Sequence, residues 1–128
     1  MSRARCGGSG ARITMPSAGN RKESRPMADV LTVVAKLRAA KGKGDALAAL
    51  LREQVAAVRK AEPGCLVYRP HRSSKDPEAF MFYEQYKDDA AFDAHRKNPI
   101  LAEYRARREK EGLVEGAVEV EIYRSITD

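Results

Sequence analysis

The order of apolar segments between residues 30 and 126 constrains the fold of this chain more than any other feature. A β-branched apolar run at residues 30–38 is followed by apolar residues at helical spacing over residues 47–58. Runs at 65–72 and 79–86 are typical of strands, and a helical stretch and a strand with alternating apolar residues complete the series. The order β-α-β-β-α-β predicts an α+β, ferredoxin-like antiparallel sheet with the helices on one face.

The second helical stretch is expected in two pieces. Asp88 or Asp89 is a suitable N-cap for the first piece. Asn98 and Pro99 predict the start of the second piece, because proline is favoured at the first position of a helix. Gly112 then ends the helix before the last strand.

Two of the predicted strands, at residues 30–38 and 79–86, are apolar on both faces. The helices cover only one face of such a sheet, and water is a poor neighbour for the other apolar face. The sequence therefore predicts a homodimer in which two sheets pack together.

Residues 1–27 are expected to be a disordered basic extension that precedes one domain at residues 28–126. The extension is rich in Gly, Ser and Arg, and its few apolar side chains cannot offset the entropy lost on ordering. A leader peptide and a start site assigned too early are the alternatives, with Met1, Met15 and Met27 as candidate first residues.

The net charge of +6 does not predict nucleic-acid binding, because residues 1–26 hold six basic side chains and one acidic one. The remaining residues hold 18 basic and 17 acidic side chains, whereas a nucleic-acid-binding domain carries a basic patch on its folded body. No apolar run has the length of a membrane helix. Cys6 and Cys65 make no disulfide framework, which is typical of a cytoplasmic protein. From these three observations we expect a cytoplasmic protein without nucleic-acid or membrane partners.

The segment from Phe82 to His95, FYEQYKDDAAFDAH, resembles the signature of the antibiotic biosynthesis monooxygenase family. In that signature, a strand ends with Glu, then any residue, and then Trp or Tyr. A helix follows that begins at an acidic cap and ends with Ala-His. The Asn98-Pro99 break and the turn at residues 62–65 resemble the same family, so the resemblance extends over about residues 29–126. It implies a dimeric α+β barrel that oxidises a quinol, polyphenol or aromatic polyketide-like small molecule with molecular oxygen and without a cofactor.

The sequence shows no metal-ligand spacing, phosphate loop or nucleophile motif. The candidate site residues are therefore chosen for the oxidation that the resemblance implies. We predict no cofactor and no metal. His95 is the expected catalytic base, because histidine titrates near neutral pH, and Tyr86 is the expected aromatic hydroxyl partner. Packing roles for both residues remain alternatives. The predicted substrate-binding residues are His71, Arg69, Glu84, Phe82 and Tyr104.

The pairing of the second and third strands decides which of these residues share a face. If the loop at residues 73–78 closes a simple hairpin, Arg72 pairs with Ala79. Arg69, His71 and Glu84 then lie on one face, where Arg69 pairs with Glu84 or orients an anionic substrate. Pro70 cannot donate a hydrogen bond to a neighbouring strand, which predicts an edge position or a bulge. A bulge at Pro70 would shift the pairing by one residue and exchange the faces.

Other functions remain open at this point. Arg69 and His71 also suit an isomerase of a small phosphorylated sugar-like ligand, and the domain also suits a non-catalytic, dimeric ligand-binding module. The basic and acidic residues at 103–111 are expected to form a solvated helix face.

Overall fold

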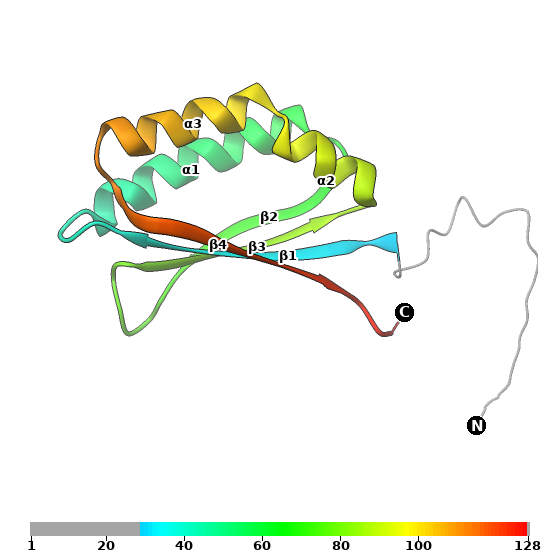
Figure 1. The fold of residues 1–128 in the computed structure, drawn as a ribbon, viewed down its shortest axis with the longest axis horizontal. Coiled ribbons are helices and arrows are strands. Elements are labelled where there is room, and N and C mark those ends of the chain that lie inside the picture. The colour runs from blue at the N-terminus through cyan, green and yellow to red at the C-terminus, as the bar shows by residue number, and fades with distance from the viewer. Residues whose placement is uncertain (1–28, 128) are drawn as a thin grey trace, which may run out of the picture.

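A computed structural model describes residues 29–127 of the chain. The elements are β1, Leu31–Ala39; α1, Gly44–Ala61; β2, Cys65–Arg72; β3, Ala79–Tyr86; α2, Asp89–Arg96; α3, Pro99–Lys110; and β4, Val114–Arg124. This order confirms the predicted pattern, including the second helix in two pieces (Figure 1). The predicted extension at residues 1–27 lies outside the described residues.

The four strands form one antiparallel sheet in the order β2-β3-β1-β4, and all three helices lie on one of its faces (Figure 1). This is the predicted ferredoxin-like arrangement. β2 is an edge strand, as Pro70 indicated, because proline cannot donate a hydrogen bond to a further strand. β4 is the other edge, and it runs beside β1 along its whole length.

The main core forms where α1 packs on the sheet. Its predicted apolar stripe is buried along the whole helix, and the stripe comprises Leu47, Leu50, Leu51, Val55 and Val58. It packs against helix-facing side chains of β1 and β3 that include Leu37 and Phe82. Burial of each such side chain contributes about 1.5–3 kcal/mol, so this contact fixes the distance between α1 and the sheet.

Two capping residues place α2 and α3 over the other half of the sheet. Asp88 Oδ1 accepts a hydrogen bond from the Ala91 N–H at 2.9 Å and caps α2. Asn98 Oδ1 accepts one from the Ile100 N–H at 2.9 Å and caps α3, of which Pro99 is the first residue. Both caps confirm the sequence analysis, and the break between the helices leaves His95 at the end of α2.

The predicted pairing of β2 with β3 is wrong by one residue. Arg72 pairs with Phe80 rather than with Ala79, because the Ser73 N–H donates to the Ala79 carbonyl and shortens the loop. The side chains of a strand alternate between faces, so a shift of one residue exchanges them. Arg69 and His71 therefore lie on the face opposite the helices, away from the predicted site, and both are exposed.

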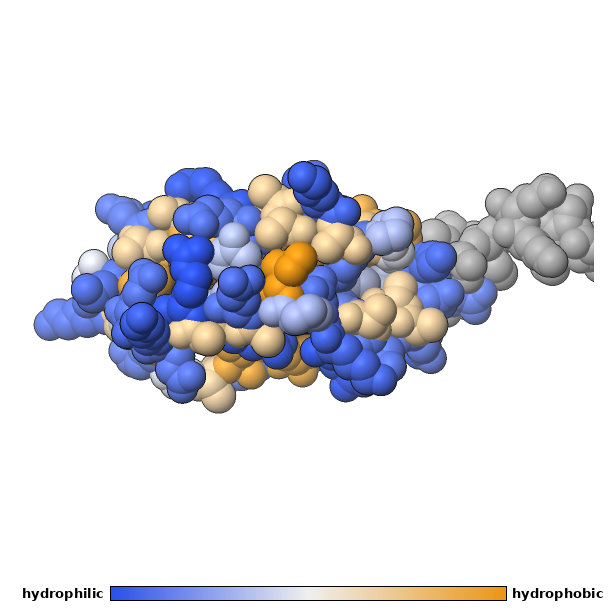
Figure 2. All heavy atoms as spheres, turned by 90° about the horizontal axis from the view of Figure 1, so that it is seen from above, coloured by the Kyte–Doolittle hydropathy of each residue, from blue (hydrophilic) through white to orange (hydrophobic). Residues whose placement is uncertain are grey.

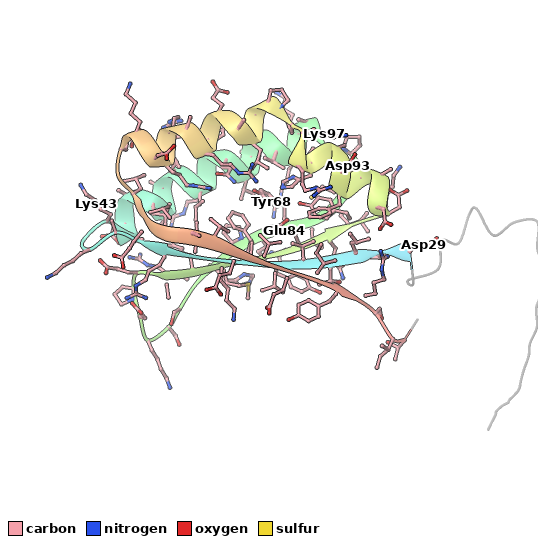
Figure 3. The ribbon with its side chains drawn as sticks, viewed as in Figure 1. Asp29, Lys43, Tyr68, Glu84, Asp93 and Lys97 are labelled. Atoms are coloured by element: carbon pink, nitrogen blue, oxygen red, sulfur yellow. The ribbon has the colours of Figure 1, made fainter. Side chains whose placement is uncertain are left out.

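The same register places Tyr68, which the sequence analysis did not select, opposite Glu84. Both side chains point from the sheet toward the helix layer (Figure 3). The irregularity in β2 lies between Cys65 and Val67, not at Pro70. It is a second departure from the simple hairpin that the prediction assumed.

The outer surface of the helix layer is polar, with charged side chains interspersed with small apolar areas (Figure 2). The edge strand β4 differs, since Val118, Val120 and Ile122 are exposed. Val120 and Ile122 pair with the helix-facing residues Ala35 and Val33 of β1, so they lie on the helix side of the sheet without being covered. No helix within residues 29–127 has the length and apolar character of a membrane span.

Candidate functional site

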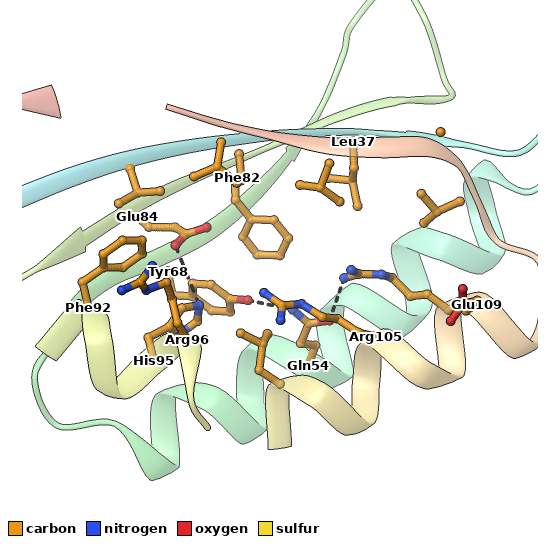
Figure 4. Close-up of a pocket in the computed structure, with 18 residues that line it drawn as sticks. Leu37, Gln54, Tyr68, Phe82, Glu84, Phe92, His95, Arg96, Arg105 and Glu109 are labelled. Atoms are coloured by element: carbon orange, nitrogen blue, oxygen red, sulfur yellow. Dashed lines mark hydrogen bonds and ion pairs between the residues drawn. The ribbon is translucent and has the colours of Figure 1, made fainter. Parts of the chain in front are cut away.

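A cavity of about 470 Å³ lies between the sheet and the helices (Figure 4). Its apolar walls come from β1, β3 and β4, and from α2 and α3. They include Val33, Ala35, Leu37, Phe82, Phe92, Leu101, Val118 and Val120. Polar side chains reach the same space from five elements. They are Glu84 from β3, Tyr68 from β2, His95 and Arg96 from α2, Gln54 from α1, and Arg105, Arg108 and Glu109 from α3. A largely apolar cavity with a few converging polar groups is typical of a small-molecule site.

His95 is held in place by the end of α1. Its Nδ1 lies 2.9 Å from Glu62 Oε1 and 3.1 Å from Glu62 Oε2, and Asn98 Nδ2 donates to Glu62 Oε2 at 2.6 Å. An ionised carboxylate only accepts hydrogen bonds, so Nδ1 of the neutral imidazole carries the hydrogen. The lone pair is then left on Nε2. Burial lowers the pKa of His95, and the adjacent Glu62 carboxylate opposes that effect.

Glu84 is a buried carboxyl group beside this imidazole. Tyr86 donates its hydroxyl hydrogen to Glu84 Oε1 at 2.6 Å. Burial raises the pKa of Glu84 to about 7, although the hydrogen bond from Tyr86 acts in the opposite direction. Burial and the nearby Glu84 raise the pKa of Tyr86 itself, so its hydroxyl stays protonated and positions Glu84.

The gap between His95 and Glu84 suits an oxygen atom of a ligand. His95 Nε2 lies 4.0 Å from Glu84 Oε1, which is too long for a hydrogen bond between them. An oxygen atom placed off the line between these atoms can approach both at about 2.8 Å. The pair can therefore contact one hydroxyl group of a bound molecule and remove its proton.

A second series of hydrogen-bonded polar side chains lies toward α3. Gln54 is buried in α1, and its Nε2 donates to the Tyr68 hydroxyl oxygen at 2.7 Å. Arg108 Nη1 donates to Gln54 Oε1 at 3.4 Å (Figure 4). Tyr68 also stacks on Phe82, with ring centroids 4.7 Å apart. The hydroxyl of Tyr68 is thereby held at the cavity wall, and burial raises its pKa so that it stays protonated.

Other reactive groups near the site have ordinary structural roles. Burial raises the pKa of the Cys65 thiol to about 12, so it is not a thiolate near neutral pH. Within the part of the chain that the structure describes, no group of three or more His, Cys, Asp or Glu side chains is arranged to hold a metal ion. The chemistry that these side chains support is proton transfer in an apolar surrounding.

The structure separates the predicted site residues into four groups. His95, Glu84 and Phe82 line the cavity together. Tyr86 does not line the cavity, but its hydroxyl donates a hydrogen bond to Glu84, which does. Tyr104 packs against the main core. The remaining two predicted residues, Arg69 and His71, are on the opposite face, so Glu84 has Tyr86 rather than Arg69 as its partner.

Sequence analysis missed Glu62, Gln54 and Tyr68, and it assigned Arg105 and Arg108 to a solvated face. Two of these had a detectable signal. Gln54 interrupts the apolar stripe of α1, which is unusual unless the amide has a buried partner. Arg108 is seven residues after the buried Leu101 and therefore on its side of α3. Glu62 had no such signal, because its partner His95 is 33 residues away.

A family model and several solved structures match this chain. The family model for antibiotic biosynthesis monooxygenases matches residues 30–107. The crystal structure of PA3566 from Pseudomonas aeruginosa is 34% identical, with a TM-score of 0.68, and the match covers 80% of this chain and 99% of that one. Protein SO0527 from Shewanella oneidensis is 32% identical, with a TM-score of 0.68, and covers 77% and 92%. A Caulobacter crescentus protein proposed to be an antibiotic biosynthesis monooxygenase shares the fold at 23% identity, with a TM-score of 0.71 and coverage of 84% and 99%.

Proposed function

The chain belongs to the antibiotic biosynthesis monooxygenase family, and from this premise we propose that it is a cofactor-independent monooxygenase. Its proposed substrates are quinols, polyphenols or aromatic polyketide-like small molecules. The observation that carries the proposal is the buried pair of His95 and Glu84, which faces an apolar cavity and is held by Glu62 and Tyr86. Family membership alone does not fix a reaction, so the proposal depends on this site.

The first proposed step is removal of a proton from a substrate hydroxyl. His95 Nε2 accepts it, and the resulting imidazolium is stabilised by the Glu62 carboxylate at Nδ1. Glu84 has a pKa of about 7 and therefore exchanges protons readily near neutral pH. Tyr86 keeps its carboxyl group oriented throughout.

The deprotonated substrate then supplies all the electrons. A hydroquinone reacts with one molecule of oxygen to give a hydroxyquinone and one molecule of water. One oxygen atom forms a bond to the ring carbon, and the other leaves as water with the two displaced hydrogens. Because the substrate is the reductant, the reaction as proposed requires neither a flavin nor a metal from the protein.

The aromatic and aliphatic walls suit this reaction. Phe82 and Phe92 line the cavity and provide surfaces for an aromatic ring. The aliphatic side chains of β1 limit water around the charged substrate, which strengthens its interactions with His95 and Glu84. This environment is consistent with binding of a flat aromatic substrate.

Oxygen uptake tests the proposal. Metal-free, colourless protein is mixed with a panel of hydroquinones and polyphenols, and oxygen consumption is recorded with an electrode. We expect uptake with at least one compound, and a loss of about 10²–10⁴ in rate for His95→Ala, the usual contribution of a general base. His71→Ala is the matched control, because His71 is exposed on the opposite face. Absence of uptake across the panel refutes the function, and an unchanged rate in His95→Ala removes His95 from it.

We also propose that the protein acts as a cytoplasmic homodimer. Apolar side chains remain exposed on β4, notably Val120 and Ile122, each with 53% of its surface accessible. Tyr83 and Tyr123 are exposed on the other face of the sheet. Association of two copies would cover such surfaces. Sedimentation equilibrium at micromolar concentration should give twice the chain mass, and a folded monomer would refute the dimer.

The alternative functions differ in how well they fit the site. The isomerase hypothesis depended on Arg69 and His71, and neither lines the cavity. A non-catalytic ligand-binding module uses the same cavity without turnover. A compound that raises the melting temperature equally with and without oxygen, and is never converted, would favour the module.

A further inference from the structure

The helix α3 presents arginines to the cavity where an apolar stripe would be expected. Leu101, Arg105 and Arg108 follow one another at intervals of four and three residues, so they share one side of the helix. All three line the cavity. Leu101 is buried, whereas the next two positions of the same stripe hold cations.

Neither cation forms an ion pair with a carboxylate among the residues that the structure describes, although Arg105 is near enough to Glu84 to lower the pKa of that carboxyl group. The hydrogen-bond partner of Arg108 is the neutral amide of Gln54, and Arg105 makes no hydrogen bond or ion pair within residues 29–127. Burial, and then repulsion from Arg105, lowers the pKa of Arg108. By contrast, the neighbouring Arg107 does not line the cavity and pairs with Glu53 of α1 at 3.1 Å. Arg108 is half-buried and Arg105 is exposed, and cations that form no ion pair with the protein at a cavity wall favour binding of an anion.

A buried hydrogen-bond donor lies at the same end of the cavity. Tyr68 is only 2% exposed, and its hydroxyl oxygen accepts from Gln54. Its own hydrogen has no acceptor among the described residues and is therefore available to a ligand. Figure 4 shows the Tyr68 ring beside His95, with its hydroxyl directed toward Gln54, and Arg105 beyond Gln54 along the cavity.

We propose that this end of the cavity binds a carboxylate group of the substrate, held by Arg105 and Arg108 and by the Tyr68 hydroxyl. The substrate is then a hydroxylated aromatic acid, whose ring lies against Phe82 and whose hydroxyl group reaches His95. This inference rests on the proposed function and names the substrate class for it. The acidic residues facing the same cavity are Glu84, which is largely protonated below pH 7, and the exposed Glu109. Arg96 also lines the cavity, but it pairs with Asp93 at 2.9 Å, so Arg105 and Arg108 are the cations available to a ligand.

A matched pair of compounds tests the carboxylate site. The acid 2,5-dihydroxybenzoate and its methyl ester have the same ring and hydroxyl groups, but only the acid is charged at neutral pH. Binding is measured by calorimetry without oxygen, so that turnover plays no part. The wild-type protein should bind the acid about tenfold to a hundredfold more tightly than the ester, as expected for charge-assisted hydrogen bonds. The preference should decrease as salt is raised.

Three variants of the same helix identify the cations involved. Arg108→Gln and Arg105→Gln should each reduce the preference for the acid at least severalfold, whereas the control Arg107→Gln should retain it. If Arg108→Gln does not fold, the exposed Arg105 and the salt dependence of the wild type decide the question. Equal binding of acid and ester, no binding of the acid, or an equal loss in Arg107→Gln would overturn the proposal.

The outcomes also separate this inference from the proposed function. A clear preference for the acid, without oxygen uptake by any hydroquinone, would refute the monooxygenase and keep the carboxylate site. Oxygen uptake without any preference for the acid would refute the carboxylate site and keep the monooxygenase.

Discussion

Replacement of Glu62 by glutamine tests how the base is held. Glutamine has the same size and keeps one acceptor oxygen, but it removes the negative charge beside His95 Nδ1. The Glu62→Gln variant should therefore lower the pKa of His95 further, because its protonated form loses the partner that stabilises it. The preference for the Nδ1–H form of the neutral ring should also weaken, because an amide oxygen is a weaker acceptor than a carboxylate.

The size of the effect follows from the geometry of the pair. The side chains of His95 and Glu62 are only 6% and 9% exposed, and the contact distance is 2.9 Å, so solvent screens the interaction little. A hydrogen bond to a charged group contributes about 1.5–3 kcal/mol. Its loss should shift the balance between the protonated and neutral imidazole about tenfold to a hundredfold toward the neutral form. The oxidation rate should fall by a similar factor, since the imidazolium formed during proton transfer is no longer stabilised.

Nitrogen-detected NMR of the imidazole rings measures both effects. The chain has two histidines, and the exposed His71 serves as an internal control in the same sample. In Glu62→Gln, the titration curve of His95 should move to lower pH, and the substitution should leave the signals of His71 as they are in the wild type. Glu53→Gln is the control variant, because Glu53 pairs with Arg107 on the exposed side of α1. An unchanged titration and tautomer of His95 would refute the role given to Glu62.

Three further predictions concern stability in urea. The pKa of Glu84 is raised from 4.5 to about 7 by folding, because the protonated carboxyl group is favoured in the buried site. The contribution of Glu84 to the free energy of unfolding is therefore complete below pH 4.5 and is lost as the pH rises to about 7. Glu84→Gln should therefore gain about 3 kcal/mol relative to wild type between pH 4.5 and pH 8, and a pH-independent difference would contradict this. Tyr68→Phe should lose about 1–3 kcal/mol, because the Gln54 amide is left without its buried acceptor, and an unchanged unfolding midpoint would count against that bond. Leu47→Ala should cost about 2–5 kcal/mol, while Leu66→Ala, at a 53% exposed position, should cost less than about 1; similar losses would argue against the described core.

The fold was largely predictable from local patterns. The apolar stripe of α1, the Asn98-Pro99 break and the proline in β2 each depend on neighbouring residues, and all three agree with the structure. The strand bounds of β2 and β3 also follow from local composition. What local patterns did not determine was the pairing of these two strands. It depends on how the loop closes at Ser73, and a one-residue error there moved Arg69 and His71 to the wrong face.

The candidate site was predictable only in part for the same physical reason. Glu84 and Tyr86 share a face of one strand, so alternation placed them together. Contacts between separate elements, such as Glu62 with His95 and Gln54 with Tyr68, depend on tertiary packing. Arg108 was indicated only by its spacing of seven residues from Leu101, because a helix rich in charged residues has no continuous apolar stripe.

Isotope labelling of oxygen tests the proposed chemistry most directly. The metal-free protein is incubated with an accepted hydroquinone under heavy-isotope oxygen gas, and product and water are analysed by mass spectrometry after a short reaction. A monooxygenase places one heavy oxygen atom in the product and the other in water, and His95→Ala should form this product far more slowly. An unlabelled quinone accompanied by hydrogen peroxide, or no labelled product from any compound in the panel, would contradict the assignment.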